Sequence, residues 1–295
     1  MKISAWHKSL GDNVVLIHGI NVDLSDKPDK VYASIIFKKN RHALDYLLDA
    51  CLDIDTDIGG SGYDLHKTLP DEIENLKPDY TLYPDNDASI GFSTRGCFRN
   101  CYFCVVPKKE GQFRQTQHPR EWYNPAFSKI TFLDNNILAD KQWFMQITEW
   151  CLQRKLKMWL TQGLDIRKVD LEIAKRLFEF KRHHMISFSW DSLKDESALR
   201  KGIELLKQAG FTKSMLRARV QFYIYVDSDA DYESGLYRCR ELKKLNCNAY
   251  VMFNIDNKQT SRIIDLKRWS KGKVYFWLID LVDFDSRARS KAVKV

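Results

Sequence analysis

The feature that most constrains the fold of this 295-residue chain is a regular alternation of short apolar runs with helical patterns. Short runs rich in β-branched and aromatic residues favour strands, and apolar residues three and four positions apart favour helices. Such alternation is typical of βα units that build a parallel sheet. The expected strands are Ile90–Thr94, Lys129–Leu133, Lys157–Thr161, Met185–Trp190, Arg219–Val226 and Ala249–Asn254, and the expected helices are Pro119–Pro125, Lys141–Lys155, Val169–Arg182, Glu196–Gly210 and Ala230–Leu245.

The residues before this alternation predict a smaller α/β region that spans 1–84. A helix is expected over Met1–Leu10 and another over His42–Leu52, with a proline-punctuated connector over Pro70–Pro84. The strands expected here are Val14–Ile17, Val31–Phe37 and Ile54–Ile58. The main domain should then cover 85–265, and 266–295 should form a C-terminal extension in which the aromatic run Val274–Val282 is a late strand or a segment that closes the side of the fold.

Three cysteines stand close together directly after the first strand of the main domain. Cys97, Cys101 and Cys104 have CxxxCxxC spacing, and Arg95–Gly96 opens the loop that carries them. Three thiolates on one loop can hold three corners of a 4Fe–4S cluster and leave one iron open to a small molecule. Two alternatives stay open at this point. One is a zinc site with His118 as the fourth ligand, and the other is a set of structural thiols.

Polar residues follow the expected strands where each strand ends. The carboxyl ends of strands meet at one edge of a parallel βα fold, so these residues are predicted to line a common ligand site. Each of them could instead only cap a helix or form a turn. The set comprises Asp134, Asn135 and Asn136 after the second strand, Gln162, Asp165 and Arg167 after the third, Ser189 and Asp191 at the fourth, Tyr225–Asp227 at the fifth, and Asn254–Asp256 at the sixth.

The sequence around the cysteines, TRGCFRNCYFC followed by VVPKKEG, resembles the cysteine motif of the radical S-adenosylmethionine superfamily. Within this superfamily, the local sequence is similar to that of the branch containing methylthiotransferases and cobalamin-domain radical enzymes. The resemblance implies a partial (β/α)6 TIM-like barrel that follows a degenerate, truncated Rossmann-like domain. It also implies reductive cleavage of S-adenosylmethionine at a 4Fe–4S cluster, which yields a 5′-deoxyadenosyl radical that takes hydrogen from a substrate.

The resemblance also suggests how S-adenosylmethionine would be held. In the superfamily, the loop after the second strand binds the amino group of the methionine moiety, and LDNN stands in place of the usual glycine-rich acidic motif. Residues that would serve are Asp134, Asn135 and Asn136 for the amino group, Phe103 for adenine, Gln162, Asp165 and Ser189 for the ribose, and Arg167 and Arg219 for the carboxylate. An electron donor of flavodoxin or ferredoxin type is implied as a partner.

Two further cofactors of that branch are not expected. The cobalamin-binding DxHxxG loop is absent, because His18 lacks the preceding Asp. The remaining cysteines, Cys51, Cys151, Cys239 and Cys247, show no metal-binding spacing, which argues against a second iron–sulfur cluster.

The charge of the chain bears on its substrate. Lys and Arg number 47 against 39 Asp and Glu, which gives a net charge of +8. This excess favours a nucleic acid or nucleotide substrate. Modification of a peptide or small metabolite is the alternative, and a non-catalytic iron–sulfur protein for electron transfer or sensing is a third reading. The densest basic groups are Lys108–Lys109 and the four residues Lys267, Arg268, Lys271 and Lys273.

The sequence also predicts a location. No run of eighteen or more apolar residues exists, so no membrane span is expected. The first residues lack the pattern of a signal peptide. Seven cysteines are an odd number and do not suggest a disulfide framework. A reducing, cytoplasmic environment is therefore expected.

Overall fold

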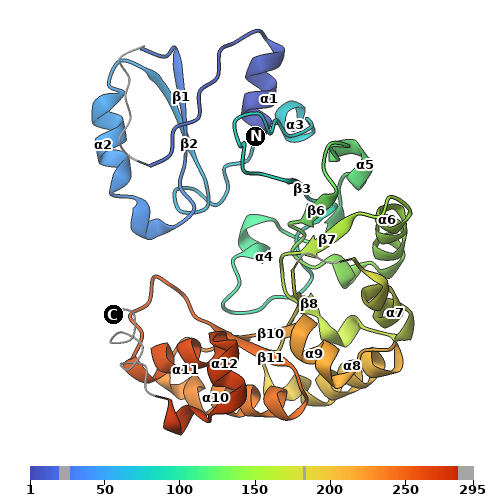
Figure 1. The fold of residues 1–295 in the computed structure, drawn as a ribbon. Coiled ribbons are helices and arrows are strands. Elements are labelled where there is room, and N and C mark those ends of the chain that lie inside the picture. The colour runs from blue at the N-terminus through green and yellow to red at the C-terminus, as the bar shows by residue number, and fades with distance from the viewer. Residues whose placement is uncertain (20–26, 182–183, 285–295) are drawn as a thin grey trace, which may run out of the picture.

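The computed structural model describes residues 1–19, 27–181 and 184–284. The fold is mixed α/β and its main strands pair in parallel, as the alternation predicts. Figure 1 shows a small N-terminal unit beside a larger curved body of strands and outer helices. The two are joined through the short helix α3 (Asp71–Glu74), which lies against α1 (Lys2–Ser9).

The N-terminal unit is built on two parallel strands, β1 (Lys30–Ser34) and β2 (Asp55–Gly59). Helix α2 (Ala43–Ala50) follows the short helix η1 (Lys38–Asn40), and α2 covers the strands. Its core is small: Ile35, Leu44 and Ile58 are the buried residues.

The strand predicted over Val14–Ile17 is wrong, because the structure gives these residues no regular element. Val15 is 73% exposed, so this apolar run has no buried face that would fix it as a strand. The predictions for the neighbouring β1, β2 and α2 are right to within a few residues.

The larger body holds two parallel sheets. The first has the order β3-β6-β7 and the second has the order β11-β10-β9-β8. Their strands are β3 (Ala88–Gly91), β6 (Lys129–Phe132), β7 (Lys157–Leu160), β8 (Leu164–Asp165), β9 (Ile186–Ser189), β10 (Val220–Tyr225) and β11 (Asn248–Met252).

Helices cover the outer side of these sheets (Figure 1). Side chains that alternate along each strand fill the space between sheet and helices, and on β10 Val220, Phe222 and Ile224 are completely buried. These residues belong to one continuous core. The covering helices are α5 (Pro119–Trp122), α6 (Lys141–Gln153), α7 (Leu171–Glu179), α8 (Glu196–Gln208), α9 (Lys213–Arg219), α10 (Asp229–Lys244), α11 (Ser261–Lys271) and α12 (Lys273–Leu278).

Two predictions in this body need correction. The first strand ends at Gly91, because the amides of Ser93 and Thr94 donate to the Asp134 carboxylate instead of continuing a ladder. The aromatic run Val274–Val282 is not a strand: most of it forms α12, in which buried Phe276 packs on Trp269 with ring centroids 5.0 Å apart. Local bonds such as Phe276 N–H to the Gly272 carbonyl (2.8 Å) satisfy its backbone.

Candidate functional site

The three cysteines lie on one loop, here called the cysteine loop, that spans residues 96–111. It is closed at its base by an antiparallel pair, β4 (Thr94–Arg95) with β5 (Arg114–Gln115), and it contains the short helix α4 (Val106–Lys109). Gly96 has a φ of +76°, and a Cβ there would lie 2.2 Å from the Gln112 carbonyl oxygen. Only glycine fits this turn.

All three thiols are free and partly exposed. The Cys97 sulfur accepts hydrogen bonds from the Arg99 amide (3.3 Å) and the Asn136 side chain (3.4 Å). Burial raises the pKa of Cys101, and the neighbouring thiolates of Cys104 and Cys97 raise it further. As their side chains stand, the described residues contain no group of three or more His, Cys, Asp or Glu gathered around one metal position.

The segment after β6 forms hydrogen bonds to the start of the cysteine loop and to the residues just before it. Asp134 is buried and its carboxylate accepts bonds from the backbone and hydroxyl groups of both Ser93 and Thr94, at 2.6–3.2 Å. Burial raises the pKa of Asp134, and these bonds oppose the rise. The Asn135 side chain accepts from the Gly96 amide at 2.9 Å. Two of the three residues predicted as ligands for an amino group are thus occupied in shaping the loop.

Asn136 stands apart from these two because half of its amide has no partner. Its nitrogen donates to the Cys97 sulfur, while its buried oxygen has no hydrogen-bond partner among the described residues. The residue is only 5% exposed and lines a small pocket, about 200 Å³ including its solvent-open part, with Phe132, Gln162, Gly163 and Leu164. A buried acceptor without a donor is costly, so the pocket is suited to a ligand that brings an N–H or O–H group.

A second set of charges holds the cysteine loop from the side of the second sheet. Arg99, which lies between Cys97 and Cys101, donates twice to one Asp165 oxygen, at 2.9 and 2.7 Å. The other oxygen accepts from Arg167 Nε at 2.7 Å, and Arg167 also pairs with Asp195. Burial opposes ionisation, but these guanidinium groups hold the pKa of Asp165 below its usual range. Asp165 and Arg167 therefore act on the loop in this structure rather than presenting free groups to a ligand.

The other predicted ligand residues lie in different places. Phe103 stacks on Tyr225 of β10, with centroids 4.1 Å apart and planes 14° apart. Ser189 lies at the end of β9, and Gln162 lines the pocket beside Asn136. Arg219 does not begin the strand as predicted: it ends α9, at the amino end of β10. That end is opposite to the edge that carries the cysteine loop.

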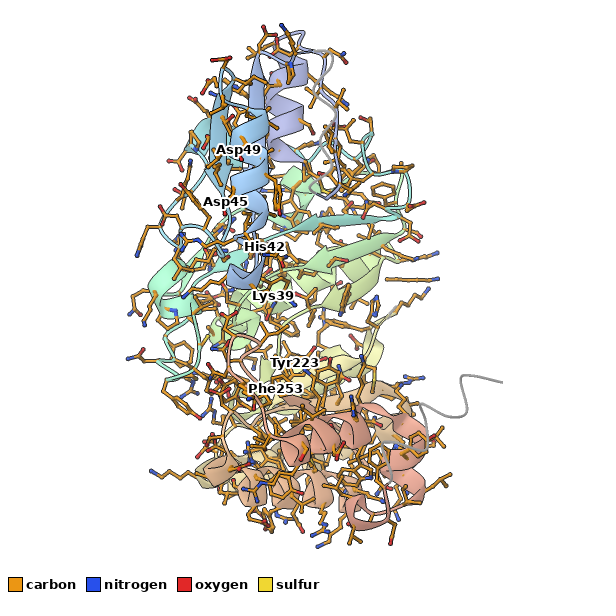
Figure 2. The ribbon with its side chains drawn as sticks, turned by 90° about the vertical axis from the view of Figure 1, so that its left-hand side faces the viewer. Lys39, His42, Asp45, Asp49, Tyr223 and Phe253 are labelled. Atoms are coloured by element: carbon orange, nitrogen blue, oxygen red, sulfur yellow. The ribbon has the colours of Figure 1, made fainter. Side chains whose placement is uncertain are left out.

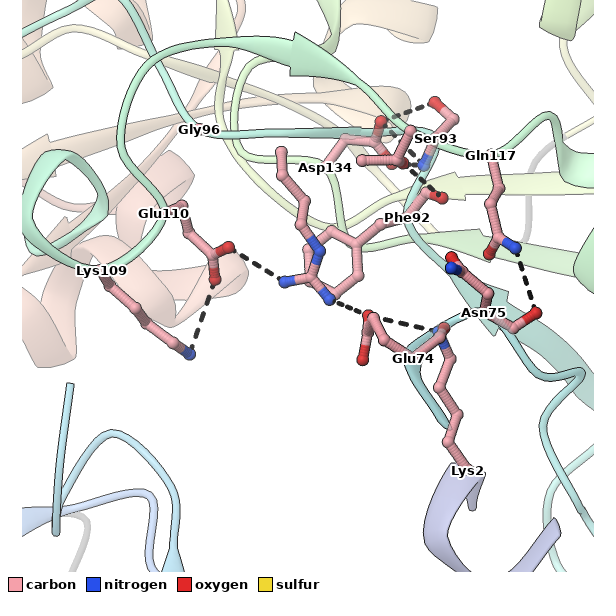
Figure 3. Close-up of polar contacts among 12 residues, drawn as sticks. Lys2, Glu74, Asn75, Phe92, Ser93, Gly96, Lys109, Glu110, Gln117 and Asp134 are labelled. Atoms are coloured by element: carbon pink, nitrogen blue, oxygen red, sulfur yellow. Dashed lines mark hydrogen bonds and ion pairs between the residues drawn. The ribbon is translucent and has the colours of Figure 1, made fainter. Parts of the chain in front are cut away.

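An outer chain of ion pairs joins the cysteine loop to the N-terminal unit. Arg95 pairs with Glu74 of α3 and with Glu110 at the far end of the loop (3.0 Å). Lys2 of α1 reaches Glu74 at 3.2 Å, and Lys109 reaches Glu110 at 3.7 Å. Figure 3 shows these pairs side by side. Lys109 also donates to Ser61 of the turn after β2, at 2.9 Å. We call this set the ion-pair chain.

Two sequence alternatives can be located as well. His118 caps α5 by accepting from the Arg120 amide (3.2 Å), and its ring packs edge-on against Trp143 and Trp150. Cys51, Cys151, Cys239 and Cys247 are buried. Burial raises the pKa of Cys239 to about 12, as expected for an inert core thiol.

Sequence reasoning missed several residues that shape this site. Arg99 and Glu110 were not singled out, and Arg95 was noted only for opening the loop, because partners that are far apart in sequence cannot be matched from charge alone. Tyr225 was expected near the end of its strand, but its stacking on Phe103 was not predicted. The period-2 pattern of β10 was the one signal that could have placed its side chain on the inner face.

Comparison with known proteins adds no identity: no protein-family model and no curated protein matches the chain. In the described part of the chain, every helix is too short or too polar to cross a membrane. What the site does must therefore be argued from its own geometry and chemistry.

Proposed function

We propose that this protein is a radical S-adenosylmethionine enzyme built on a partial (β/α)6 barrel, with a degenerate Rossmann-like unit at its N-terminus. One observation carries the proposal. Three free thiols share a loop at the carboxyl ends of parallel strands, and Asn136, which bonds to the first sulfur and lines a pocket, has a buried oxygen without a partner among the described residues. The sequence wording around the cysteines supports the same reading.

The donor set fits a 4Fe–4S cluster in number and kind. Cys97, Cys101 and Cys104 would hold it, since thiolates are the usual ligands and three of them leave one iron free. Zinc is a poorer fit, because His118 is already engaged as a helix cap between two tryptophans. When bound, the cluster would supply the electron that cleaves S-adenosylmethionine into methionine and a 5′-deoxyadenosyl radical.

The protein's own residues would bind and orient the reactants. The Asn136 oxygen would accept a hydrogen bond from the ligand's ammonium group, and such charge-assisted bonds are the stronger kind. The stacked pair of Phe103 and Tyr225 would offer its outer face to adenine, and Gln162 and Ser189 would bond to the ribose hydroxyls. Asp134, Asn135 and Asp165 would act indirectly, by holding the cysteine loop in shape.

The proposal is tested first by metal content. Anaerobic reconstitution should give about four irons per chain. Replacing Cys97, Cys101 or Cys104 by Ala should each abolish the cluster, whereas Cys51→Ala, a buried cysteine of the N-terminal unit, should keep it. Iron content and the visible absorption of the cluster are the measurements. Full iron in a double variant such as Cys97→Ala/Cys101→Ala would refute the assignment, as would tight zinc without iron.

The second test separates an enzyme from a passive iron–sulfur protein. The reconstituted protein is mixed with S-adenosylmethionine and dithionite, and 5′-deoxyadenosine is measured by chromatography. Its release supports the enzymatic proposal. Iron without any 5′-deoxyadenosine would favour a role in electron transfer or sensing.

A further inference from the structure

The inner face of the second sheet is not packed as a core. On β10, Val220, Phe222 and Ile224 face the helices and are fully buried, while Gln221, Tyr223 and Tyr225 face inward and are only half-buried. In closed barrels, bulky aliphatic side chains fill this space. Here the inward positions carry polar and aromatic groups that remain accessible to a ligand.

Three tyrosines on this face form what we call the tyrosine shelf: Tyr223, Tyr225 and Tyr250. Tyr223 on β10 is directly beside Tyr250 on β11 in the parallel register, with ring centroids 5.8 Å apart. Among the described residues, neither of these two hydroxyls has a hydrogen-bond partner, whereas Tyr225 stacks on Phe103 of the cysteine loop. The planes of Tyr223 and Tyr250 are 77° apart, so a ligand can stack on one of these rings at a time, with two free hydroxyl groups beside it.

The shelf adjoins the pocket of Asn136. A Cβ added at Gly163, which lines that pocket, would lie 3.1 Å from the Tyr223 ring. Phe103, one residue before Cys104, contacts Tyr225. A planar group stacked on Tyr223 or Tyr250 would thus lie beside the site proposed for S-adenosylmethionine.

The shelf can also be reached from outside. Among the described strands, β3 and β11 pair on one side only, so the sheets do not close on each other. In Figure 1 the N-terminal unit is drawn at the top and helices α10, α11 and α12 at the bottom. Figure 2 looks at this side of the molecule, with Lys39 and His42 above Tyr223 and Phe253 below it. Tyr223 and Tyr250 are also partly exposed, so a ligand can reach their rings.

Basic side chains lie on both sides of this face, and the carboxylates of Asp45 and Asp49 lie beyond His42 on α2 (Figure 2). Lys39 is exposed on the N-terminal unit, and on the opposite side Lys267 lies over the Phe253 ring at 4.0 Å. The carboxylates nearest the shelf are already engaged. Asp191 accepts from the Tyr225 amide (3.0 Å), and Asp227 accepts from Asn254 and Asn257 (3.0 and 2.7 Å). They are poorly placed to select a cationic peptide side chain.

We propose that the tyrosine shelf binds an unpaired base of a single-stranded nucleic acid, with its phosphates between Lys39 and Lys267. Aromatic platforms flanked by basic residues are how proteins hold single strands, because every base has a face that can stack. A base inside a duplex could not rest on the shelf without leaving its stack. The inference rests on the proposed function in one respect: the bound base would be the substrate of the radical reaction.

The test is fluorescence anisotropy with labelled 12-nucleotide RNA and DNA of mixed sequence, single-stranded and as duplexes. Single strands should bind at low salt and more weakly as salt rises. Tyr223→Leu and Tyr250→Leu should each weaken binding by about tenfold. Tyr223→Phe keeps the ring and should bind within about twofold of the wild type. Lys39→Gln and Lys267→Gln should each lower the salt slope by about one.

Tyr237→Leu is the matched control, because Tyr237 is an exposed tyrosine of the outer helix α10, where it bonds to Glu196. It should bind as the wild type does. Duplexes that bind as tightly as single strands, equal binding by the Tyr223→Leu variant, or no binding of either nucleic acid at low salt would each overturn the shelf proposal. The RNA and DNA arms decide which nucleic acid is held.

Failure of this inference can be told apart from failure of the proposed function. Iron content and 5′-deoxyadenosine release do not need the oligonucleotide, so both can be normal while binding is absent. In that case the shelf proposal is wrong and the chemistry stands. A 5-iodouracil oligonucleotide gives an independent readout: irradiation should crosslink it to the peptide that contains Tyr223, and a crosslink elsewhere in the chain counts against the shelf.

Discussion

At the scale of single residues, Asn136 is notable because its amide nitrogen and its amide oxygen have different surroundings. Its nitrogen bonds to the Cys97 sulfur and its oxygen is buried without a partner. We expect Asn136→Leu, which is similar in size, to weaken S-adenosylmethionine binding by about tenfold or more, because a bond to a charged group is worth about 1.5–3 kcal/mol. Iron content should stay near that of the wild type. Calorimetric titration of the reconstituted protein measures the binding.

Unchanged affinity in the Asn136→Leu variant would mean that the unpaired oxygen does not meet the ligand. Gln142→Leu serves as its control, since Gln142 is an exposed residue of α6 on the outer surface. That change should alter neither iron content nor affinity.

Asp165 is the second residue for which the structure predicts a clear effect. Its carboxylate holds Arg99 of the cysteine loop and Arg167 at once. Asp165→Asn removes the charge and should free the loop, so amide hydrogen exchange of residues 97–104 should accelerate by about tenfold, a change of about 1.4 kcal/mol in the opening free energy. Asp170→Asn, which weakens a helix cap and a bond to Lys141, should leave loop exchange unchanged. Equal protection of the loop in both variants would contradict the role given to Asp165.

At the scale of elements, the ion-pair chain makes the N-terminal unit part of the site. It runs from Lys2 through Glu74, Arg95 and Glu110 to Lys109, so both of its ends reach the N-terminal unit. Arg95→Gln should lower the free energy of unfolding by about 1–2 kcal/mol. It should also change the EPR spectrum that the reduced cluster gives with S-adenosylmethionine, because the loop loses its outer support.

Arg176→Gln is a matched control for the Arg95 variant. Arg176 is similarly buried and also pairs with two carboxylates, those of Glu149 and Glu179, but on the outer helices. It should cost similar stability and leave the EPR spectrum unchanged. Arg95→Lys should restore the wild-type EPR spectrum only in part, since an ammonium group cannot bind two carboxylates in the fixed geometry of a guanidinium group. Identical spectra for both glutamine variants would reduce Arg95 to a general stabilising role.

At the scale of the whole molecule, the sequence predicted the repeating parts better than the particular ones. Strands β6, β7, β9, β10 and β11 were placed to within two residues, because their apolar runs are bounded by polar turns. The break after Gly91 could not be predicted, since it depends on the Asp134 carboxylate, which is forty residues further on. The run at Val274–Val282 was ambiguous because a short apolar run suits a helix as well as a strand.

In the candidate site, too, the positions of residues were predicted better than their contacts. The spacing of Cys97, Cys101 and Cys104 located the loop, and the LDNN segment was correctly placed beside it. The roles within the set were harder to predict: Asp165 bonds to both Arg167 and Arg99, and only a folded chain brings these three residues together. Local patterns identify which residues are polar and near a strand end, but pairing across the sheet decides which of them remain free.

One consequence follows from the way the cysteine loop is held. Asp134 bonds to Thr94 just before the loop, Asp165 bonds to Arg99 within it, and Glu110 near its end pairs with Arg95. All three contacts are made by the polypeptide alone. The ordering entropy of the loop is therefore spent when the chain folds, not when metal arrives. Under the proposed function, loading and loss of iron would be local exchange reactions in a loop that is already folded, unlike in small metal-dependent domains, which unfold without their metal. Under the proposed function, the protein would therefore keep its fold in a cell that is short of iron.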